Sequence, residues 1–182
     1  MSTTNNWNAH PVGCRSAGAG SPWKEINLGS YPTVIALREA LKEQRILIGD
    51  LADRMLELPS FHVSSSVTRI KLMVLTATEL GLGIDSTSFA QVQAHALKMG
   101  LDLCPPEVGP QLRLQYLAQK VGEYLLIGMK PLHTASRIDA CFVVANGGAG
   151  LLLIGRLARS DLTVSSQSQF VFALRQQQRD VH

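Results

Sequence analysis

The feature that most constrains the fold is a succession of apolar segments in the second half of the chain, with no helical pattern between them. Four of these segments have the length and composition of strands: Glu123–Met129, Ala140–Ala145, Leu151–Leu157 and Phe170–Leu174. Strands that follow one another directly in the sequence pair in antiparallel fashion. The tripeptide Asn146-Gly147-Gly148 is typical of a hairpin turn, because these residues tolerate positive φ. We therefore expect a C-terminal antiparallel sheet or a partly closed barrel.

Charged residues are scarce in the same part of the chain. Only 8 of the 55 residues at positions 121–175 are Asp, Glu, Lys or Arg. Because a solvated strand needs a polar face, so few charges indicate a sheet that is covered on both faces or meets a partner. The C-terminal sheet is therefore where we expect burial and binding.

The first half of the chain is predicted to be mostly helical. Apolar residues recur at helical spacing over 33–44 and again over 50–58, with a short break between the two segments. A third helix is predicted to begin after the hydroxyl side chains at 86–88 and to end at Gly100, which favours a left-handed stop. The segment 69–75 alternates and then becomes wholly apolar, which is typical of a strand that runs into the core.

The chain divides into a tail and one domain. Residues 1–22 are rich in Ser, Asn, Gly and Ala and offer little to bury, so we predict a mobile tail. Residues 23–182 are numerous enough to bury their own core. They are predicted to form a single α+β domain, with N-terminal helices packed on the C-terminal antiparallel sheet or partly closed barrel.

Polar and apolar residues alternate strictly over Gln111–Tyr116. A period of two residues places Gln111, Arg113 and Gln115 on one face of an extended chain. We therefore predict a fifth strand here, directly before the other four.

A resemblance includes the same region. The segment Leu103–Tyr116 (LCPPEVGPQLRLQY) resembles a near-identical segment in a group of short, uncharacterised bacterial proteins. The likeness extends from Trp23–Ile26 through Leu75–Gly81 to Gly122–Met129, which is most of the chain beyond the tail. The resemblance implies a bacterial origin and a cytoplasmic setting. It implies no activity, because we know of none established for these proteins, and it assigns a role to no residue.

The densest group of chemically versatile side chains lies in and after this segment. Glu107 belongs to a stretch stiffened by prolines, and Arg113 follows it on the predicted strand. A carboxylate and a guanidinium held together are able to bind a polar ligand or to take part in acid–base chemistry. The alternative, which we favour, is a structural ion pair at the junction of helices and sheet. We take Glu107, Arg113, Glu123 and His133 as the candidate ligand-binding residues, and no catalytic residue is assigned.

Several other kinds of site are disfavoured. Cys104 and His133 are conceivable as a nucleophilic pair, but a cysteine between Leu103 and Pro105 is typically a small buried apolar residue. No two histidines have metal-ligand spacing and the cysteines lie far apart, so no metal site is predicted. The chain has neither GxGxxG nor GxxxxGK[ST], so no cofactor is expected.

Nucleic acid is a disfavoured partner. The net charge is only +3, which gives little attraction to phosphate. The two N-terminal helices have the spacing of a helix-turn-helix, but the second carries Asp50, Asp53 and Glu57 against Arg54 alone. Because DNA repels negative charge, a helical hairpin over the sheet is the better interpretation.

Membrane association is not expected, since no apolar run approaches the roughly 18 residues that span a bilayer. An odd number of dispersed cysteines fits a reducing cytoplasm. The last strand, Phe170–Leu174, is a candidate for a sheet edge, and an uncovered edge invites homo-oligomerisation.

Three functions remain open. The leading one is a non-enzymatic module for a small ligand or a protein, held at one end of the C-terminal sheet. Its site would be lined by the loops Cys104–Pro110, 131–137 and 158–169. The second is an enzyme, a hydrolase or transferase that acts on a polar substrate through Glu107 and Arg113. The third is a DNA-binding regulator that uses the two N-terminal helices over 33–58.

Overall fold

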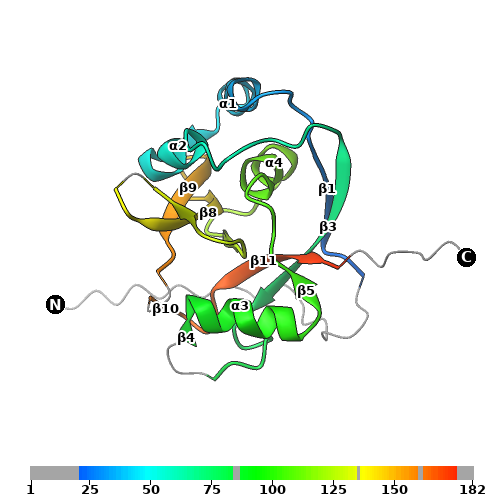
Figure 1. Cartoon of the computed structure of the whole chain (residues 1–182), viewed down its shortest axis with the longest axis vertical. Helices are drawn as coiled ribbons and strands as arrows, with labels where there is room; N and C mark the ends of the chain where they lie inside the picture. The colour runs from blue at the N-terminus through cyan, green and yellow to red at the C-terminus, as the bar shows by residue number, and fades with distance from the viewer. Residues whose placement is uncertain (1–20, 84–86, 135, 160–161, 176–182) are drawn as a thin grey trace, which may run out of the picture.

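The structure, a computed structural model, describes residues 21–83, 87–134, 136–159 and 162–175. Within these residues the chain forms a large curled sheet and four helices (Figure 1). The helices are α1 (Val34–Glu43), α2 (Asp50–Leu56), α3 (Phe89–Lys98) and α4 (Val108–Gln115). The strands are β1 (Lys24–Leu28), β2 (Leu47–Ile48), β3 (Thr68–Thr76), β4 (Thr87–Ser88), β5 (Leu101–Asp102), β6 (Tyr124–Ile127), β7 (Leu132–His133), β8 (Asp139–Asn146), β9 (Leu151–Leu157), β10 (Thr163–Val164) and β11 (Gln169–Leu174). The predicted tail lies outside the described residues except for 21 and 22.

The main sheet has the strand order β1-β3-β11-β6-β8-β9-β2, with β5 beside β11 and β7 beside β8. Along this order, β11 pairs parallel with β6 and β2 pairs parallel with β9, whereas the other neighbours are antiparallel. The expectation of a C-terminal antiparallel sheet is therefore corrected. The sheet is mixed, and β1 and β3 from the first half of the chain belong to it.

Strand β11 lies inside the sheet, between β3 and β6. Its residues Phe170 to Ala173 are all buried, as expected of a strand covered on both faces. The prediction that the last strand forms a sheet edge is therefore wrong, and homo-oligomerisation through that strand loses its basis. The sheet ends instead at β1 and at β2.

The segment predicted as a fifth strand is the helix α4. Pro110 occupies its first turn, where a missing N–H costs no hydrogen bond. The alternation of polar and apolar residues was misleading, because the polar side chains are not on a solvated face. Glu107, Gln111 and Gln115 are spaced by four residues, and Gln111 donates to Glu107 at 3.0 Å along the helix. Residues Val108 to Arg113 are buried, so polar groups on both sides of α4 must find partners inside the protein.

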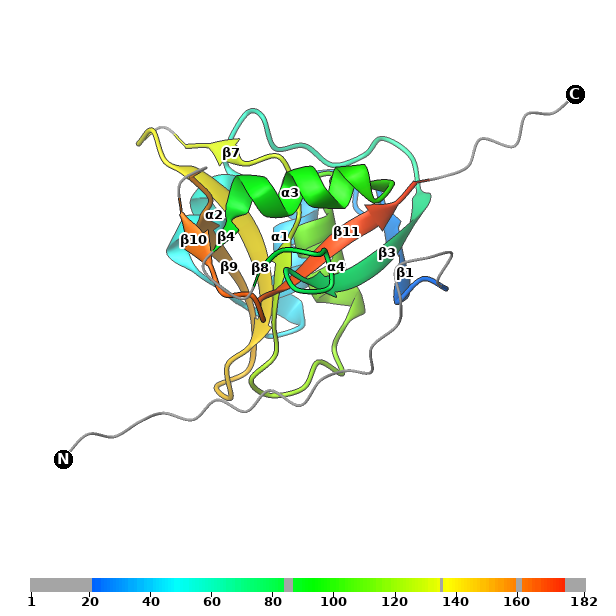
Figure 2. The ribbon, with the colours of Figure 1, turned by 90° about the horizontal axis from the view of Figure 1, so that it is seen from below.

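Helix α4 lies on the concave side of the curled sheet and contacts β1, β8, β9 and α1 (Figure 1). Gly109 allows this close approach, because a Cβ there would lie 2.6 Å from the Cβ of Phe142 on β8. Helix α3 lies on the other side of β11 (Figure 2). There the rings of Phe89 and Phe170 are 6.1 Å apart. Helices therefore cover both faces of the central part of the sheet, which explains why its strands carry few charges.

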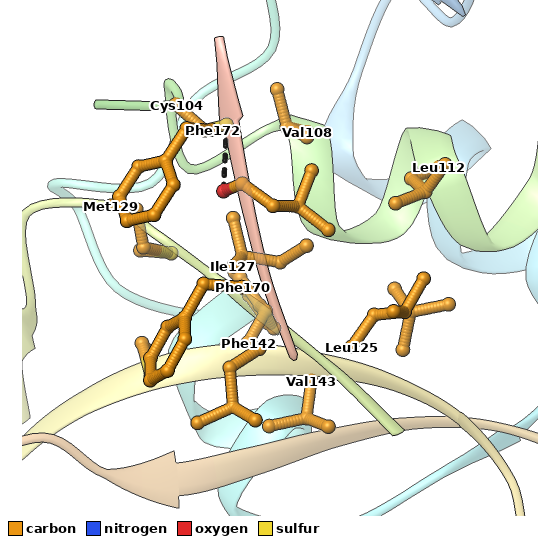
Figure 3. Close-up of a cluster of buried hydrophobic side chains, with 14 of the residues drawn as sticks. Cys104, Val108, Leu112, Leu125, Ile127, Met129, Phe142, Val143, Phe170 and Phe172 are labelled. Atoms are coloured by element: carbon orange, nitrogen blue, oxygen red, sulfur yellow. Dashed lines mark hydrogen bonds between the residues drawn. The ribbon is translucent and has the colours of Figure 1, made fainter. Parts of the chain in front are cut away.

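The core between α4 and the sheet is apolar (Figure 3). Val108 and Leu112 of α4 face residues of β6, β8 and β11, among them Ile127 and Phe142. Cys104 lies at the edge of this cluster, with its thiol directed at the carbonyl oxygen of Val171 at 3.4 Å. The interpretation of this cysteine as a small packed residue is therefore confirmed.

Other local predictions agree with the structure. The four predicted C-terminal strands correspond to β6, β8, β9 and β11, and β8 pairs with β9 as a hairpin around the Asn146-Gly147-Gly148 turn. The three N-terminal helices correspond to α1, α2 and α3, and Gly100 after α3 has φ +83°. In the part of the chain that the structure describes, no helix is long and apolar enough to cross a membrane.

Candidate functional site

The structure separates the four candidate ligand-binding residues into three places. Glu107 lies at the start of α4, next to the loops that precede α1 and β3. Arg113 lies on a different side of the helix, near Glu123. His133 lies on β7 beside β8. Six residues along a helix amount to a rotation of about 600°, so Glu107 and Arg113 point in different directions. The expected ion pair between them is replaced by separate sets of hydrogen bonds.

The carboxylate of Glu107 is only 2% exposed and is fully used inside the protein. It accepts hydrogen bonds from the Gly29 N–H at 2.7 Å, the Ser64 N–H at 2.8 Å, the Ser64 hydroxyl at 2.6 Å and the Gln111 amide at 3.0 Å. Burial by itself raises the pKa of Glu107, but these hydrogen bonds outweigh it, so the pKa is lowered. Gly29 has φ +68° and its Cβ would meet the Ser66 carbonyl oxygen, so glycine is needed there. Glu107 therefore joins two loops to the start of α4.

Gln115 lies at the end of α4, on the same face as Glu107 and Gln111, and its side chain covers part of the β1 edge of the sheet. Its side-chain amide accepts from the Asn27 N–H at 2.9 Å and donates to the Asn27 carbonyl oxygen at 2.9 Å. The amide thus makes the two hydrogen bonds that a neighbouring strand would make. Such protection of a sheet edge disfavours pairing with another chain.

Arg113 is completely buried and ties α4 to β8 and to the following loop. Its guanidinium donates to the carbonyl oxygen of Ala145 at 3.0 Å, to the carbonyl oxygen of Tyr116 and to the side chain of Gln119. Burial lowers the pKa of Arg113 to about 10, although the charges of Tyr116 and Glu123 oppose this shift. The guanidinium is therefore charged at neutral pH, and the carboxylate of Glu123 favours this charged form.

Glu123 is the one candidate that the structure brings together with Arg113. Burial and the Glu123 carboxylate raise the pKa of Tyr116 to about 12, against the effect of Arg113. Gln119 connects the cluster to β8 through a hydrogen bond to the Val144 carbonyl oxygen at 3.0 Å. Arg113 Nε and Glu123 Oε2 are buried with no hydrogen-bond partner among the described residues. The sequence did not identify Gln119, because a glutamine in a loop has no distinguishing pattern.

His133 and Cys104 do not form a nucleophilic pair. The imidazole Nδ1 of His133 lies 2.8 Å from the Asp139 carboxylate on an exposed part of β7 and β8. The thiol of Cys104 is 3% exposed and burial raises its pKa strongly. A protonated, buried thiol is a poor nucleophile. In the described parts of the chain, no group of three or more His, Cys, Asp or Glu side chains is placed to hold a metal ion.

A surface groove of about 680 Å³ lies between α1, β2 and α2, and we call it the α1–α2 groove. Its lining is Val34, Ile35, Arg38, Glu39 and Lys42 of α1, Ile46, Leu47 and Ile48 at β2, and Asp53, Leu56 and Glu57 at α2. Ile35 is 70% exposed and Leu47 is 52% exposed. These apolar side chains gain most if a partner covers them.

The charges in the groove are largely paired across it. Arg38 on α1 contacts the carboxylate of Asp53 on α2, and it lies 3.5 Å from the carboxylate of Glu57. The ion pairs connect the two helical walls of the groove. The sequence carried one signal for this groove, since Ile35 is apolar but lies beside the stripe that α1 buries.

The second cavity, about 220 Å³, is smaller and lined mostly by polar groups, among them Asn27, Tyr31 and Gln111. Neither of these cavities is lined by Glu107, Arg113, Glu123 or His133. Residues of the three loops that we expected to form a pocket also line neither of them.

Comparison of the chain with protein-family models, with curated proteins and with solved structures finds no match. The resemblance of Leu103–Tyr116 to short bacterial proteins stays a prediction. In this chain the segment forms the approach to α4 and the buried helix itself.

Proposed function

We propose that the protein is a non-enzymatic interaction module and that the α1–α2 groove is its binding site. The observation that carries this proposal is the pair of exposed apolar side chains, Ile35 and Leu47, in a groove whose walls are connected by the ion pairs of Arg38. Binding sites typically combine such an apolar surface with a few placed charges on a rigid frame. The volume of about 680 Å³ falls within the range of ligand sites.

This proposal moves the site away from the three loops selected from the sequence. The first of them, Cys104–Pro110, leads into a buried helix and has its main chain committed to the core, for example through the Cys104 N–H and the Gly128 carbonyl oxygen at 2.8 Å. The connections 131–137 and 158–169 each include residues outside the described ranges. The class of function stays the one that the sequence favoured, and its location changes.

The enzyme alternative gains no support from the geometry. A substrate must reach catalytic groups, whereas Glu107 and Arg113 are almost wholly buried and bound to internal partners. Their hydrogen bonds join secondary-structure elements, which is a structural role.

The DNA-binding alternative uses the same region as the α1–α2 groove. Over residues 34–57 the chain carries four basic and five acidic residues, and Arg38 is already paired with carboxylates. A surface without net positive charge does not attract phosphates. A protein segment or an uncharged small ligand fits this surface better. The buried free thiols of Cys104 and Cys141 favour a reducing compartment such as the cytoplasm.

The proposal is tested by an NMR screen of the full chain against a library of small aliphatic and aromatic fragments. We expect the hits to shift the backbone amide signals of Ile35, Leu47 and Glu57. Ile35→Glu should abolish these shifts, because it places a charge in the groove. The matched control is Val121→Glu, since Val121 is 74% exposed and outside the groove. The proposal fails if no fragment shifts the groove signals or if Ile35→Glu binds the fragments as the wild type does.

A further inference from the structure

Strand β2 is the floor of the α1–α2 groove and also one end of the sheet. It pairs with β9 on one side, with Leu47 opposite Leu152 and Ile48 opposite Leu153. The Gly49 N–H donates to the Leu153 carbonyl oxygen at 2.9 Å. Because backbone groups alternate in direction along a strand, Ile48 turns its N–H and its carbonyl oxygen away from β9. On that side of β2 the described chain provides no strand.

The two ends of the sheet are treated differently. At β1, the outward N–H and carbonyl oxygen of Asn27 are both occupied by the side chain of Gln115. At β2, the corresponding groups of Ile48 lie beside an apolar groove. An open strand edge next to exposed apolar side chains is the arrangement by which domains add a strand from a partner.

We infer that the α1–α2 groove takes an extended segment of a partner protein, which adds to the outer edge of β2 through the backbone of Ile48. This inference rests on the proposed function. The segment would place alternate apolar side chains against Ile35 and Leu47, which stand exposed in the groove. Main-chain hydrogen bonds give such a complex its register, and the apolar contacts select the sequence.

The length and charge of the groove define the segment further. Helix α1 forms one wall with 10 residues, which span about 15 Å and match four to five extended residues at about 3.3 Å each. The groove holds Arg38 and Lys42 against Glu39, Asp53 and Glu57. One excess negative charge favours a segment with a Lys or Arg beside its apolar residues over an acidic one.

The experiment is the selection of binders for the full chain from a phage-displayed library of random linear peptides. The selected peptides are then synthesised, and their affinities are measured by fluorescence anisotropy. We expect alternating apolar residues with a basic residue, and a loss of at least about tenfold in affinity for Leu47→Glu and Ile35→Glu. Val121→Glu should bind as the wild type does.

A series of peptides, each N-methylated at one amide, tests the strand addition without altering the protein. Methylation removes a donor, so it should cost about tenfold at the amide that faces Ile48 and little at the next amide along the peptide. A loss that does not alternate, or peptides that bind as helices, would overturn the inference while the groove stays a binding site. Failure of both peptides and fragments to engage the groove would remove the proposed function as well.

Self-association is the competing occupant. Sedimentation of the chain across a range of concentrations should show a monomer. A dimer that is broken by Ile35→Glu and not by Val121→Glu would mean that a second copy fills the groove, and the inference of a separate partner would be wrong.

Discussion

Replacing Glu107 with glutamine tests whether this carboxylate is a structural group. One oxygen accepts from the Gly29 N–H and the Gln111 amide, and the other accepts from the N–H and the hydroxyl of Ser64. Glutamine has one acceptor oxygen and an NH₂ group of the same shape. In either orientation the NH₂ faces a backbone N–H, that of Gly29 or that of Ser64, so at least one hydrogen bond is lost and a buried donor remains unsatisfied.

The magnitude follows from these losses. An unsatisfied buried donor costs about 1–3 kcal/mol, so Glu107→Gln should lower the free energy of unfolding by about 1–3 kcal/mol. That is a large part of the ~5–15 kcal/mol typical of a folded domain. The assay is urea denaturation followed by circular dichroism. The matched control is Glu25→Gln, because Glu25 is exposed on β1 and 3.5 Å from Arg69. The control should change the free energy of unfolding by no more than about 0.5 kcal/mol. Equal effects of the two substitutions would refute the structural role of Glu107.

Lowering the pH should reduce the difference in unfolding free energy between the wild type and Glu107→Gln. The pKa of Glu107 in the folded protein lies below its ordinary value, so the folded state favours the ionised carboxylate. Its contribution is complete above the unfolded pKa of about 4.3 and is lost as the pH falls toward the folded pKa. A difference in unfolding free energy that stays constant as the pH falls through this range would contradict the assignment.

Two further predictions concern the packing of α4. Gly109→Ala should destabilise the protein by about 1–3 kcal/mol, because the new Cβ would lie 2.6 Å from the Cβ of Phe142. An unchanged melting temperature for Gly109→Ala in differential scanning calorimetry would contradict the close contact. Arg113→Met should cost about 3–5 kcal/mol in urea denaturation, because it leaves the oxygens of Gln119, Ala145 and Tyr116 without their donor. Adding Glu123→Gln should reduce the cost, because it removes the negative charge that favours a charged residue 113. The arginine cluster is not structural if Arg113→Met costs no more than the surface substitution Arg54→Met.

The elements that the sequence predicted well are those whose local chemistry is specific. Asn146-Gly147-Gly148 marked the β8–β9 hairpin, because few residues accept positive φ. Gly100 marked the end of α3 for the same reason. The segment 151–157 was apolar enough to predict β9 with its bounds unchanged.

The errors arose where a pattern had two physical causes. Alternation over 111–116 indicated a strand with one wet face, but it came from a buried helix whose polar groups bind internal partners. The four-residue spacing of Glu107, Gln111 and Gln115 is typical of a helix face, and it matches the observed hydrogen bond between the first two. The place of β11 in the sheet depends on its long-range pairing with β3 and β6, which the residues of β11 alone do not determine.

The α1–α2 groove was not among the sites that we predicted from the sequence. The groove is formed by residues of three elements, α1, β2 and α2. Its shape depends on how these elements pack, which the sequence of any one of them does not predict. In the sequence, Ile35 differs from its neighbours only as an apolar residue beside the stripe that α1 buries, and Leu47 lies in a strand of two residues, which is too short to show a pattern.

Hydrogen exchange at the Ile48 amide tests the central claim most directly. In the free chain this N–H faces the open edge of β2, whereas the Gly49 N–H is already bonded to Leu153. Saturation with the tightest of the selected linear peptides should slow exchange at Ile48 by about tenfold or more and leave Gly49 nearly unchanged. Exchange at Ile48 that stays equally fast in the saturated complex would contradict strand addition at the α1–α2 groove.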